Sequence, residues 1–290
     1  DILFALGFGM LEVGTLTPRS QPGNPLPRMF RLVEDRALIN RLGFNNEGLE
    51  PMRERLRSRK SRGMLGVNLG KNRDTPISRA VGDYLLGMRG THPWADYFCI
   101  NISSPNTEDL RRLQEGDALQ GLLDGICRER EKLDAERGKT TPVLIKLAPD
   151  WEEGALEASI GMIREYPLDG IVATNTTIER PHLKSPLRIE TGGLSGAPVF
   201  GLSTDILRTL YRELGSKMSI IGVGGIFSGR EAYEKIRSGA SAVQIYTSLV
   251  YEGPGVVATI KRELEELLLR DGLVSVAEAV GLDADRPVQD

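Results

Sequence analysis

The chain has 290 residues and a mass of 31.8 kDa, long enough for one large barrel or two medium-sized domains. Its 40% hydrophobic and 27% charged residues are typical of a globular protein, and its net charge of −3 excludes a global basic field that would favour nucleic acid. No apolar stretch approaches the length that spans a bilayer, and no secretory signal is visible. Cys99 and Cys127 have no metal-ligand spacing, so they indicate a reducing compartment and no disulfide framework.

The chain begins with the pattern of the last turns of an amphipathic helix, so we expect further sequence before Asp1. From there, short apolar runs alternate with longer helical patterns, which is typical of repeated βα units. The expected strands are residues 10–17, 64–70, 97–104, 143–148, 170–176, 220–226 and 242–249. The expected helices are residues 48–60, 76–89, 118–137, 152–165, 204–214, 229–238 and 254–269.

The strand pattern predicts the α/β class and a (β/α)8 TIM barrel, because several strands are almost continuously apolar, as buried parallel strands are. Such a barrel needs eight strands, and seven are visible. The simplest interpretation is that the first strand is missing from the given chain and precedes Asp1. An open doubly wound sheet is the alternative, but it would more often carry a Gly-rich turn after its first strand. No linker divides the chain, so we expect one domain over residues 1–290.

Two connections are longer than a simple barrel requires. Residues 18–44 carry four prolines and then an apolar–polar alternation that predicts a small hairpin. Residues 177–203 contain Thr-Gly-Gly-Leu-Ser-Gly at 191–196. Because both connections follow strands, we expect both at the catalytic face, where long ordered loops usually serve as lids or walls.

Polar residues recur where the expected strands end. The run Asn-Ile-Ser-Ser-Pro-Asn-Thr at 101–107 follows an apolar strand, and such residues pack poorly in a core. Other strand ends hold Thr15, Asn68, Lys146 and Thr-Asn-Thr at 174–176. The Lys146 ammonium needs an anionic or electron-rich partner unless it reaches solvent. A ring of Asn, Thr and Lys with few carboxylates favours an electron-rich heteroaromatic ligand over a metal ion.

The last two expected strands end in a pattern that favours phosphate binding. Residues 220–226 place three glycines before a helix, and residues 242–248 end in hydroxyl side chains. In barrels, the loops after the last two strands commonly bind phosphate through backbone N–H groups and a helix dipole. The structural alternative is a tight turn that needs positive φ. Three glycines, together with Gly196, are more than one such turn needs.

Other chemistries have less support. A Ser–His–acid triad needs a histidine, and only His92 and His182 are present. His92 precedes its strand, so about eight residues at ~3.3 Å each place it more than about 20 Å from Ser104, whereas His182 in the second long connection stays a candidate. Cys99 is expected in the core. The basic run at 53–60 is expected to be a solvated helix face, with nucleic-acid binding as the alternative.

Several motifs together resemble class 2 dihydroorotate dehydrogenase, the quinone-dependent type. They are residues 17–19 (Thr-Pro-Arg), 21–24 (Gln-Pro-Gly-Asn), 43–48 (Gly-Phe-Asn-Asn-Glu-Gly), 66–72 (Gly-Val-Asn-Leu-Gly-Lys-Asn), 101–107, 174–177 (Thr-Asn-Thr-Thr), 191–196 and 220–226. The resemblance runs in order across essentially the whole chain. It implies an FMN-containing barrel that oxidises dihydroorotate to orotate in de novo pyrimidine (UMP) biosynthesis, with a quinone as the final electron acceptor.

The resemblance also implies roles for single residues. Ser104 matches the catalytic base, which would take a proton from the carbon next to a ring carbonyl while a hydride moves to flavin N5. The orotate-binding residues would be Asn45, Asn106, Asn175 and Thr176, with Asn101 facing both rings. The flavin contacts would be Thr15, Asn68, Lys146 and Thr174, and the contacts around the FMN phosphate would be Gly196, Gly225, Tyr246 and Thr247. No metal is implied.

The chain departs from the family pattern in several places. The family's first-strand Phe-Asp-Lys segment and its membrane-associated amphipathic helices are absent, and residues 108–111 read Glu-Asp-Leu-Arg where Pro-Gly-Leu-Arg is usual. The resemblance implies a monomer without a nucleic-acid partner. It would be membrane-associated and peripheral, on a bacterial or mitochondrial inner membrane, through the missing N-terminal part.

Two rival interpretations stay open. Another FMN barrel, such as a class 1 dihydroorotate dehydrogenase or a dihydrouridine synthase, would want a cysteine in the catalytic loop, where Ser104 stands. The other rival is a non-catalytic truncated fragment that cannot hold FMN, because an incomplete barrel leaves an open sheet edge.

Overall fold

The computed structural model describes residues 1–61 and 63–285 of the chain. Its internal contacts divide it into two compact units. Unit 1 comprises Asp1–Arg28, Arg41–Leu147 and Trp151–Asp169, and unit 2 comprises Met29–Asn40, Ala148–Asp150 and Gly170–Asp290. The expectation of a single domain over residues 1–290 stays a prediction.

Unit 1 is built on four parallel strands. β1 (Met10–Leu16), β4 (Met64–Leu69), β5 (Tyr97–Asn101) and β6 (Val143–Leu147) pair in that order. The same unit holds α1 (Ile2–Ala5), α2 (Leu49–Arg57), α3 (Ala80–Thr91), α4 (Gly116–Arg137) and α5 (Ala155–Arg164). β4, β5 and β6 are buried almost throughout, as the apolar runs predicted. The residues that follow the carboxyl ends of these strands therefore gather at one edge of the sheet.

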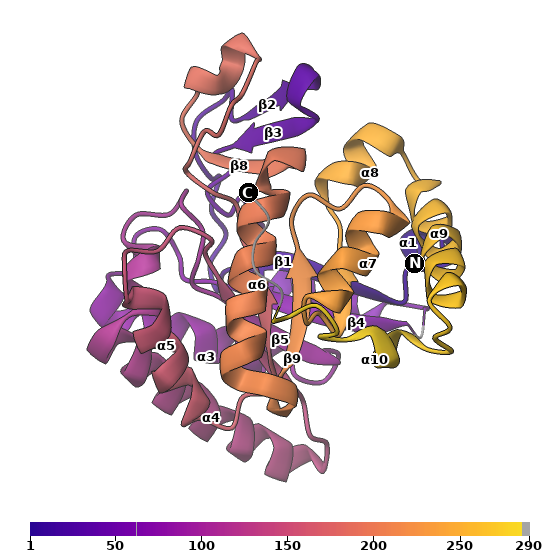
Figure 1. Ribbon diagram of the computed structural model, residues 1–290. Helices are drawn as coiled ribbons and strands as arrows, with labels where there is room; N and C mark the ends of the chain where they lie inside the picture. The colour runs from indigo at the N-terminus through magenta and orange to yellow at the C-terminus, as the bar shows by residue number, and fades with distance from the viewer. Residues whose placement is uncertain (62, 286–290) are drawn as a thin grey trace. The chain divides into compact units, whose positions relative to one another are not determined.

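Unit 2 contains three further parallel strands, β7 (Gly170–Ala173), β9 (Ser219–Val223) and β10 (Ala242–Gln244), which pair in that order. Its helices are α6 (Phe200–Leu214), α7 (Gly229–Arg237), α8 (Thr247–Glu252), α9 (Val256–Arg270) and α10 (Val276–Ala279) (Figure 1). Tyr233 and Ile236 of α7 share an apolar cluster with Leu264 and Leu267 of α9. Together, the two units contain every strand that the apolar runs predicted.

A small antiparallel sheet in unit 2 ties the two long connections together. It joins β2 (Met29–Leu32) and β3 (Ala37–Asn40), the predicted hairpin, to β8 (Gly193–Gly196). The hairpin prediction is therefore confirmed, but β8 was not predicted, because Gly-Leu-Ser-Gly has few residues that favour strands. β8 forms because Leu194 is fully buried in a common core with Leu32 and Ile39. Figure 1 shows the three strands side by side.

Several element boundaries correct the sequence-based expectations. The strands expected over 97–104, 170–176 and 220–226 end at Asn101, Ala173 and Val223. The strand expected over 242–249 ends at Gln244, and Thr247 instead begins α8. A short apolar run does not distinguish a strand from a buried helical turn, and hydroxyl residues are common where helices begin. The helix expected from residue 204 begins at Phe200, after a single turn of 3₁₀ helix over Ala197–Val199.

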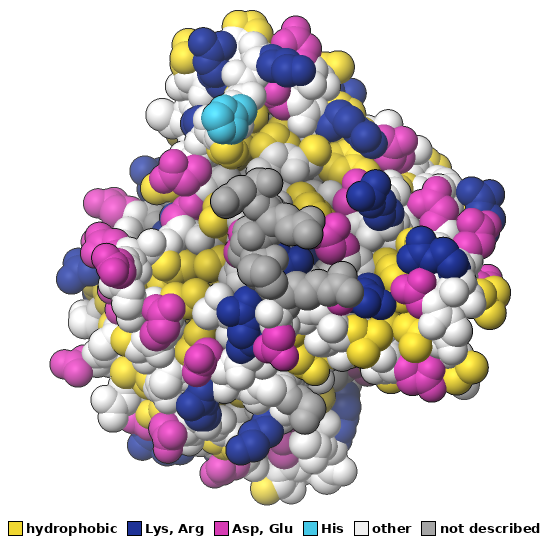
Figure 2. Space-filling view, viewed as in Figure 1, with side chains coloured by type: hydrophobic (Ala, Val, Ile, Leu, Met, Phe, Trp, Pro, Cys, Tyr) yellow, Lys and Arg dark blue, Asp and Glu magenta, His cyan; other side chains and the backbone are white. Residues whose placement is uncertain are grey.

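The surface carries charges of both signs. Figure 2 shows acidic and basic side chains intermingled on the visible face. On α2, Arg53 pairs with Glu50 (2.9 Å), and Arg55 pairs with Glu47, so the basic run there is a solvated helix face as predicted. Within the described part of the chain, no helix has both the length and the apolar character needed to cross a membrane.

Candidate functional site

The run 101–107 begins at the last residue of β5 and folds into a buried turn. The Asn101 Oδ1 atom accepts hydrogen bonds from the Ser103 backbone N–H (3.3 Å) and from the Ser103 hydroxyl (3.1 Å). The Tyr84 hydroxyl donates to the Asn101 carbonyl (2.9 Å), which ties α3 to the end of β5. Asn101 and Ser104 are only 5% and 6% exposed. The polar run is therefore a buried, hydrogen-bonded element at a strand end of unit 1.

Ser104 has one hydrogen-bond partner among the residues that the structure describes. The backbone N–H of Asn106 donates to Ser104 Oγ (3.2 Å). A donor aimed at a hydroxyl oxygen stabilises negative charge on it, so this bond favours loss of the hydroxyl proton. The Asn106 carbonyl in turn accepts from the Asn24 side chain (3.2 Å), which braces the turn from the first long connection.

His92 follows α3 and is engaged away from this turn. Its Nε2 lies 3.1 Å from Asp134 Oδ1 and 3.2 Å from Thr141 Oγ1. Asp134 is on α4, and Thr141 precedes β6, so His92 lies at the amino ends of the strands, as predicted. His182 is exposed in unit 2. Across the described residues, neither histidine is hydrogen-bonded to Ser104.

The structure brings together four of the residues predicted to contact flavin. The Thr15 hydroxyl donates to Asn68 Oδ1 (2.7 Å). The Asn101 side-chain amide donates to Thr15 Oγ1 (3.1 Å) and to Asn68 Oδ1 (3.2 Å). Lys146 joins this network through Glu12, which contacts both Lys146 and Asn68. Thr15, Asn68, Asn101 and Lys146 occupy the last or next-to-last positions of β1, β4, β5 and β6, so neighbouring strands build one polar cluster.

Glu12 is the residue of this cluster that the sequence analysis missed. Its Oε1 lies 3.6 Å from Lys146 Nζ and accepts from Asn68 Nδ2 (2.8 Å). The prediction that Lys146 needs a partner is thus confirmed, and the partner is anionic. The sequence does indicate Glu12, because an acid inside the apolar run 10–17 is as unusual as Lys146 inside its own strand.

Cys99 is fully buried, as predicted for a core residue. This burial raises the pKa of its thiol.

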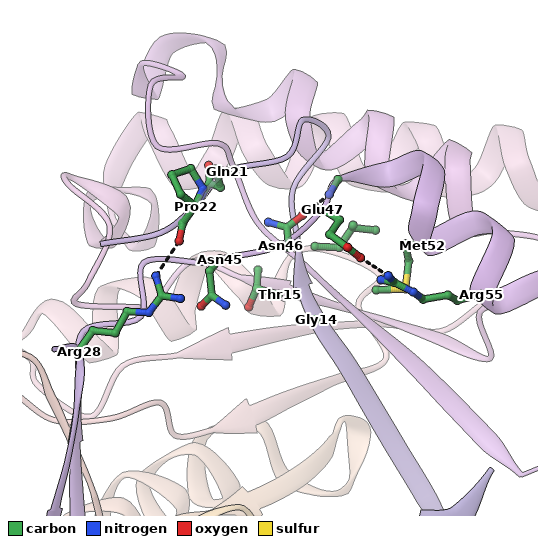
Figure 3. Close-up of a pocket in the computed structure, with 12 residues that line it drawn as sticks. Gly14, Thr15, Gln21, Pro22, Arg28, Asn45, Asn46, Glu47, Met52 and Arg55 are labelled. Atoms are coloured by element: carbon green, nitrogen blue, oxygen red, sulfur yellow. Dashed lines mark hydrogen bonds and ion pairs between the residues drawn. The ribbon is translucent and has the colours of Figure 1, made fainter. Parts of the chain in front are cut away.

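A cavity of about 490 Å³ opens beside this cluster in unit 1 (Figure 3). It is lined by Gly14, Thr15, Leu16, Gln21, Pro22, Arg28, Asn45, Asn46, Glu47, Gly48, Met52 and Arg55. Asn45 is exposed on its wall and has no hydrogen-bond partner in the described chain. Arg28 donates to the Pro22 carbonyl (2.6 Å), so the wall is an ordered structure. This places the predicted substrate residue Asn45 and the predicted flavin residue Thr15 on the same cavity.

Asn46, the neighbour of Asn45 in the motif 43–48, holds this wall in place. Its side-chain Oδ1 accepts from the Gly48 backbone N–H (2.8 Å), and its Nδ2 donates to Thr17 Oγ1 (2.8 Å) and to the Phe44 carbonyl (2.8 Å). Both asparagines of the motif therefore line the cavity, and Asn46 also satisfies polar groups of the loop.

In unit 2, residues 174–176 were expected to end the strand over 170–176, but they follow β7, which ends at Ala173. Thr174 is 2% exposed, and Asn175 Oδ1 accepts from the Thr176 backbone N–H (2.8 Å). The next residue, Thr177, donates its hydroxyl to Asp150 and exchanges backbone hydrogen bonds with Leu194. The turn after β7 is thus anchored to β8.

Gly196 and Gly225, two of the residues predicted to contact phosphate, lie in closely packed loops of unit 2. Gly225 has φ +74°, and a Cβ atom built there would lie 2.4 Å from Phe200 Cβ. Gly196 has φ +103°, and its Cβ would lie 2.4 Å from the Arg36 carbonyl oxygen and 3.1 Å from Thr247 Cγ2. Thr247 donates to Ser195 Oγ (2.8 Å), whereas the Tyr246 side chain is exposed. Glycine is required here for both backbone conformation and space, as the tight-turn alternative states, and phosphate binding by these loops stays a prediction.

The Ser248 hydroxyl is buried next to Thr247 and lacks a hydrogen-bond partner among the described residues. Buried hydroxyls are normally satisfied, so this atom is an exception in the described chain. An oxyanion would supply the missing acceptor.

Lys235 of α7 contacts the loop that contains Gly224 and Gly225 indirectly, through Ser203. Its Nζ donates to Ser203 Oγ (2.5 Å), and a Cβ on Gly224 would lie 2.7 Å from that same oxygen. Lys235 is fully buried, and burial lowers the pKa of its ammonium to about 7, against the opposing effect of Glu234 and Asp205. The lysine therefore loses its proton far more easily in the folded chain than in the unfolded chain.

The lowered pKa of Lys235 predicts a rise in stability with pH. The unfolded chain keeps this proton up to pH 10.5, whereas the folded chain releases it near pH 7, so stability grows between those values. We expect wild type to gain about 1 kcal/mol per pH unit, relative to Lys235→Met, between roughly pH 7.5 and 9. Chemical denaturation of both proteins across this range measures the difference. A constant difference would contradict the prediction, and Lys261→Met on the exposed face of α9 is the matched control.

Known proteins resemble this chain over nearly its whole length. The dihydroorotate dehydrogenase family profile matches residues 1–268. A curated "Dihydroorotate dehydrogenase (quinone)" from Delftia acidovorans is 50% identical over 273 residues, covering 92% of this chain and 78% of that protein. One of the same name from Myxococcus xanthus is 49% identical and covers 99% of this chain and 78% of that protein.

The solved structures agree with these relatives. A crystal structure of DHODH from Eimeria tenella, in complex with ferulenol, matches with a TM-score of 0.90 and 42% sequence identity. The match covers 98% of this chain and 81% of that chain. The predicted α/β barrel class is therefore confirmed. The chain belongs to the dihydroorotate dehydrogenase family.

Proposed function

We propose that this chain binds FMN, takes electrons from dihydroorotate and passes them to a quinone. The family sets the reaction: the chain is an oxidoreductase that converts dihydroorotate to orotate in pyrimidine biosynthesis, and the family is flavin-dependent. FMN, the quinone and the individual residue roles are our proposal. The observation that carries it is the hydrogen-bonded cluster of Thr15, Asn68, Asn101 and Lys146, a donor and acceptor set that suits a heteroaromatic ring.

Within unit 1, Thr15, Asn68, Asn101 and Lys146 would bind the flavin ring. The family resemblance assigns Thr174 of unit 2 to the ring as well. Within unit 2, the loops at Gly196 and Gly225, with Tyr246, Thr247 and the Ser248 hydroxyl, would bind the phosphate. When bound, FMN supplies the hydride acceptor that no side chain provides.

Ser104 would act as the general base in this reaction. Its Oγ would take a proton from a substrate ring carbon as its own proton leaves to solvent, while the Asn106 N–H stabilises the charge on the oxygen. In unit 1, Asn45, Asn101 and Asn106 would bind the alternating N–H and C=O groups of the pyrimidine. The family resemblance assigns substrate binding to Asn175 and Thr176 of unit 2 as well. A serine at this position, in place of cysteine, favours the quinone-dependent class over the class 1 and dihydrouridine synthase alternatives.

Because quinones dissolve in lipid, we further propose that the protein is bound peripherally at a bacterial or mitochondrial inner membrane. We also propose that it works as a monomer, as the family resemblance implies. The names of the curated relatives include the quinone, which supports this choice of acceptor.

The identity of the cofactor is tested by releasing it. Acid denaturation of the purified protein, followed by chromatography against FMN, FAD and riboflavin standards, is expected to give FMN at one per chain. FAD, or no flavin after reconstitution, would contradict the proposal. With dihydroorotate as donor, a soluble quinone should reoxidise the reduced protein, and NAD⁺ should not.

A further inference from the structure

We propose that Glu12 is a positioning residue, which fixes the side chains of Lys146 and Asn68 in the orientation that the flavin ring requires. The inference rests on the proposed FMN-dependent function. It adds a residue that need not itself touch the flavin.

The Glu12 carboxylate belongs to β1 of unit 1 and is buried. Its side chain is 7% exposed, and Lys146, at 14% exposed, is its ion-pair partner across 3.6 Å. A carboxylate without partners is strongly disfavoured at such a site, and a buried pair adds little stability over apolar residues of the same size. Stability alone therefore gives a weak reason for placing two charges here.

Three neighbouring strands are arranged around this carboxylate. Glu12 of β1 is in register with Gly66 of β4, and Gly66 is in register with Tyr97 of β5. A Cβ atom on Gly66 would lie 1.9 Å from Tyr97 Cζ, so the missing side chain lets the Tyr97 ring cross β4. The Tyr97 hydroxyl then donates to Glu12 Oε2 (3.4 Å), and burial raises the pKa of this phenol, so it stays a donor.

Glu12 also fixes the orientation of the Asn68 carboxamide. A carboxylate only accepts hydrogen bonds, so Asn68 must turn its Nδ2 toward Glu12 (2.8 Å). Asn68 Oδ1 then necessarily faces Thr15 and Asn101, which donate to it at 2.7 Å and 3.2 Å. One buried charge thereby sets the donor and acceptor pattern of three proposed flavin contacts.

The ion pair also sets the charge that Lys146 presents. A lone ammonium would stabilise the more electron-rich, reduced flavin strongly, and the Glu12 carboxylate offsets part of that field. Glu12 should therefore hold the flavin reduction potential lower than Lys146 alone would. A purely structural role for Glu12 does not make this prediction.

The test is Glu12→Gln in the FMN-loaded protein, with the midpoint potential measured by equilibration with a redox dye. We expect the potential to shift to a more positive value and the FMN Kd to rise by about tenfold, since a charged acceptor that orients Asn68 is lost. Glu50→Gln is the matched control, because Glu50 is an exposed glutamate that pairs with Arg53 (2.9 Å) on α2. This control should change neither quantity.

An unchanged potential and Kd in Glu12→Gln, with flavin bound to wild type, would overturn the inference alone. A wild-type protein that binds no flavin would overturn the proposed function as well. If Glu12→Gln does not fold, Glu12→Asp replaces it, because the shorter side chain keeps the charge but withdraws it from Asn68. We then expect a weaker FMN Kd with a potential nearer to wild type, and a Kd equal to wild type would overturn the inference.

Discussion

Replacing Ser104 with alanine is expected to slow the reduction of bound flavin by dihydroorotate by about 10²–10⁴-fold, the usual contribution of a general base. The variant keeps the strand end intact, because the one described hydrogen bond of Ser104 is the one it accepts from the Asn106 N–H. FMN content should therefore stay close to that of wild type. Anaerobic stopped-flow absorbance, after mixing with dihydroorotate, measures the rate of the step directly.

Ser103 provides the matched control for this experiment. It is also buried, but its hydroxyl donates to Asn101 Oδ1 (3.1 Å) and has no proposed part in proton transfer. We expect Ser103→Ala to lose less than about tenfold in the same rate, on the scale of one neutral hydrogen bond. Equal losses in both variants would indicate a structural cause. A near-normal rate in Ser104→Ala would remove Ser104 from the role of base.

The second large effect is expected from Gly225→Ala in unit 2. The new Cβ would lie 2.4 Å from Phe200 Cβ and 2.7 Å from Phe200 Cα, at a residue with φ +74°. Relief of this overlap needs movement of the loop, at a cost of about 1–3 kcal/mol, so its N–H groups leave the phosphate. We expect the FMN Kd to rise by about 10–100-fold, as measured by quenching of flavin fluorescence on titration of the apoprotein.

Two comparisons separate phosphate binding from general damage. Gly253→Ala is the matched control, because Gly253 has φ +71° but nothing within 4 Å of its Cβ position. It should leave the FMN Kd within about threefold of wild type, since a Cβ there overlaps no atom and the loop of Gly225 need not move. Riboflavin lacks the phosphate, so its Kd should change little in Gly225→Ala. An equal loss for both flavins would contradict a phosphate role for this loop.

The parallel strands could be predicted from sequence because each is a short apolar run with polar residues at its end. Burial on both faces imposes that pattern, and β5 with Asn101 at its last position is an example. The same rule fails where a run is short and its ends are ambiguous. Residues 242–249 have the composition of a strand, yet the chain turns at Tyr246 and begins α8 at Thr247.

Interactions between distant residues were harder to predict. β8 exists because Leu194 fits a core made by the hairpin, which its own Gly-rich sequence does not indicate. The need of Lys146 for a partner was predictable from the cost of burying a charge, but Glu12 as that partner was not. That pairing depends on the register of β1 beside β4 and on the space left by Gly66, which only the folded sheet reveals.

The proposed function requires that this chain holds a flavin that dihydroorotate reduces. The most direct test is to mix the FMN-loaded protein with dihydroorotate under anaerobic conditions and to follow the visible flavin absorbance. We expect the flavin absorbance to decrease and one orotate to form for each flavin reduced. A bound flavin that dithionite bleaches, but that dihydroorotate leaves oxidised, would contradict it.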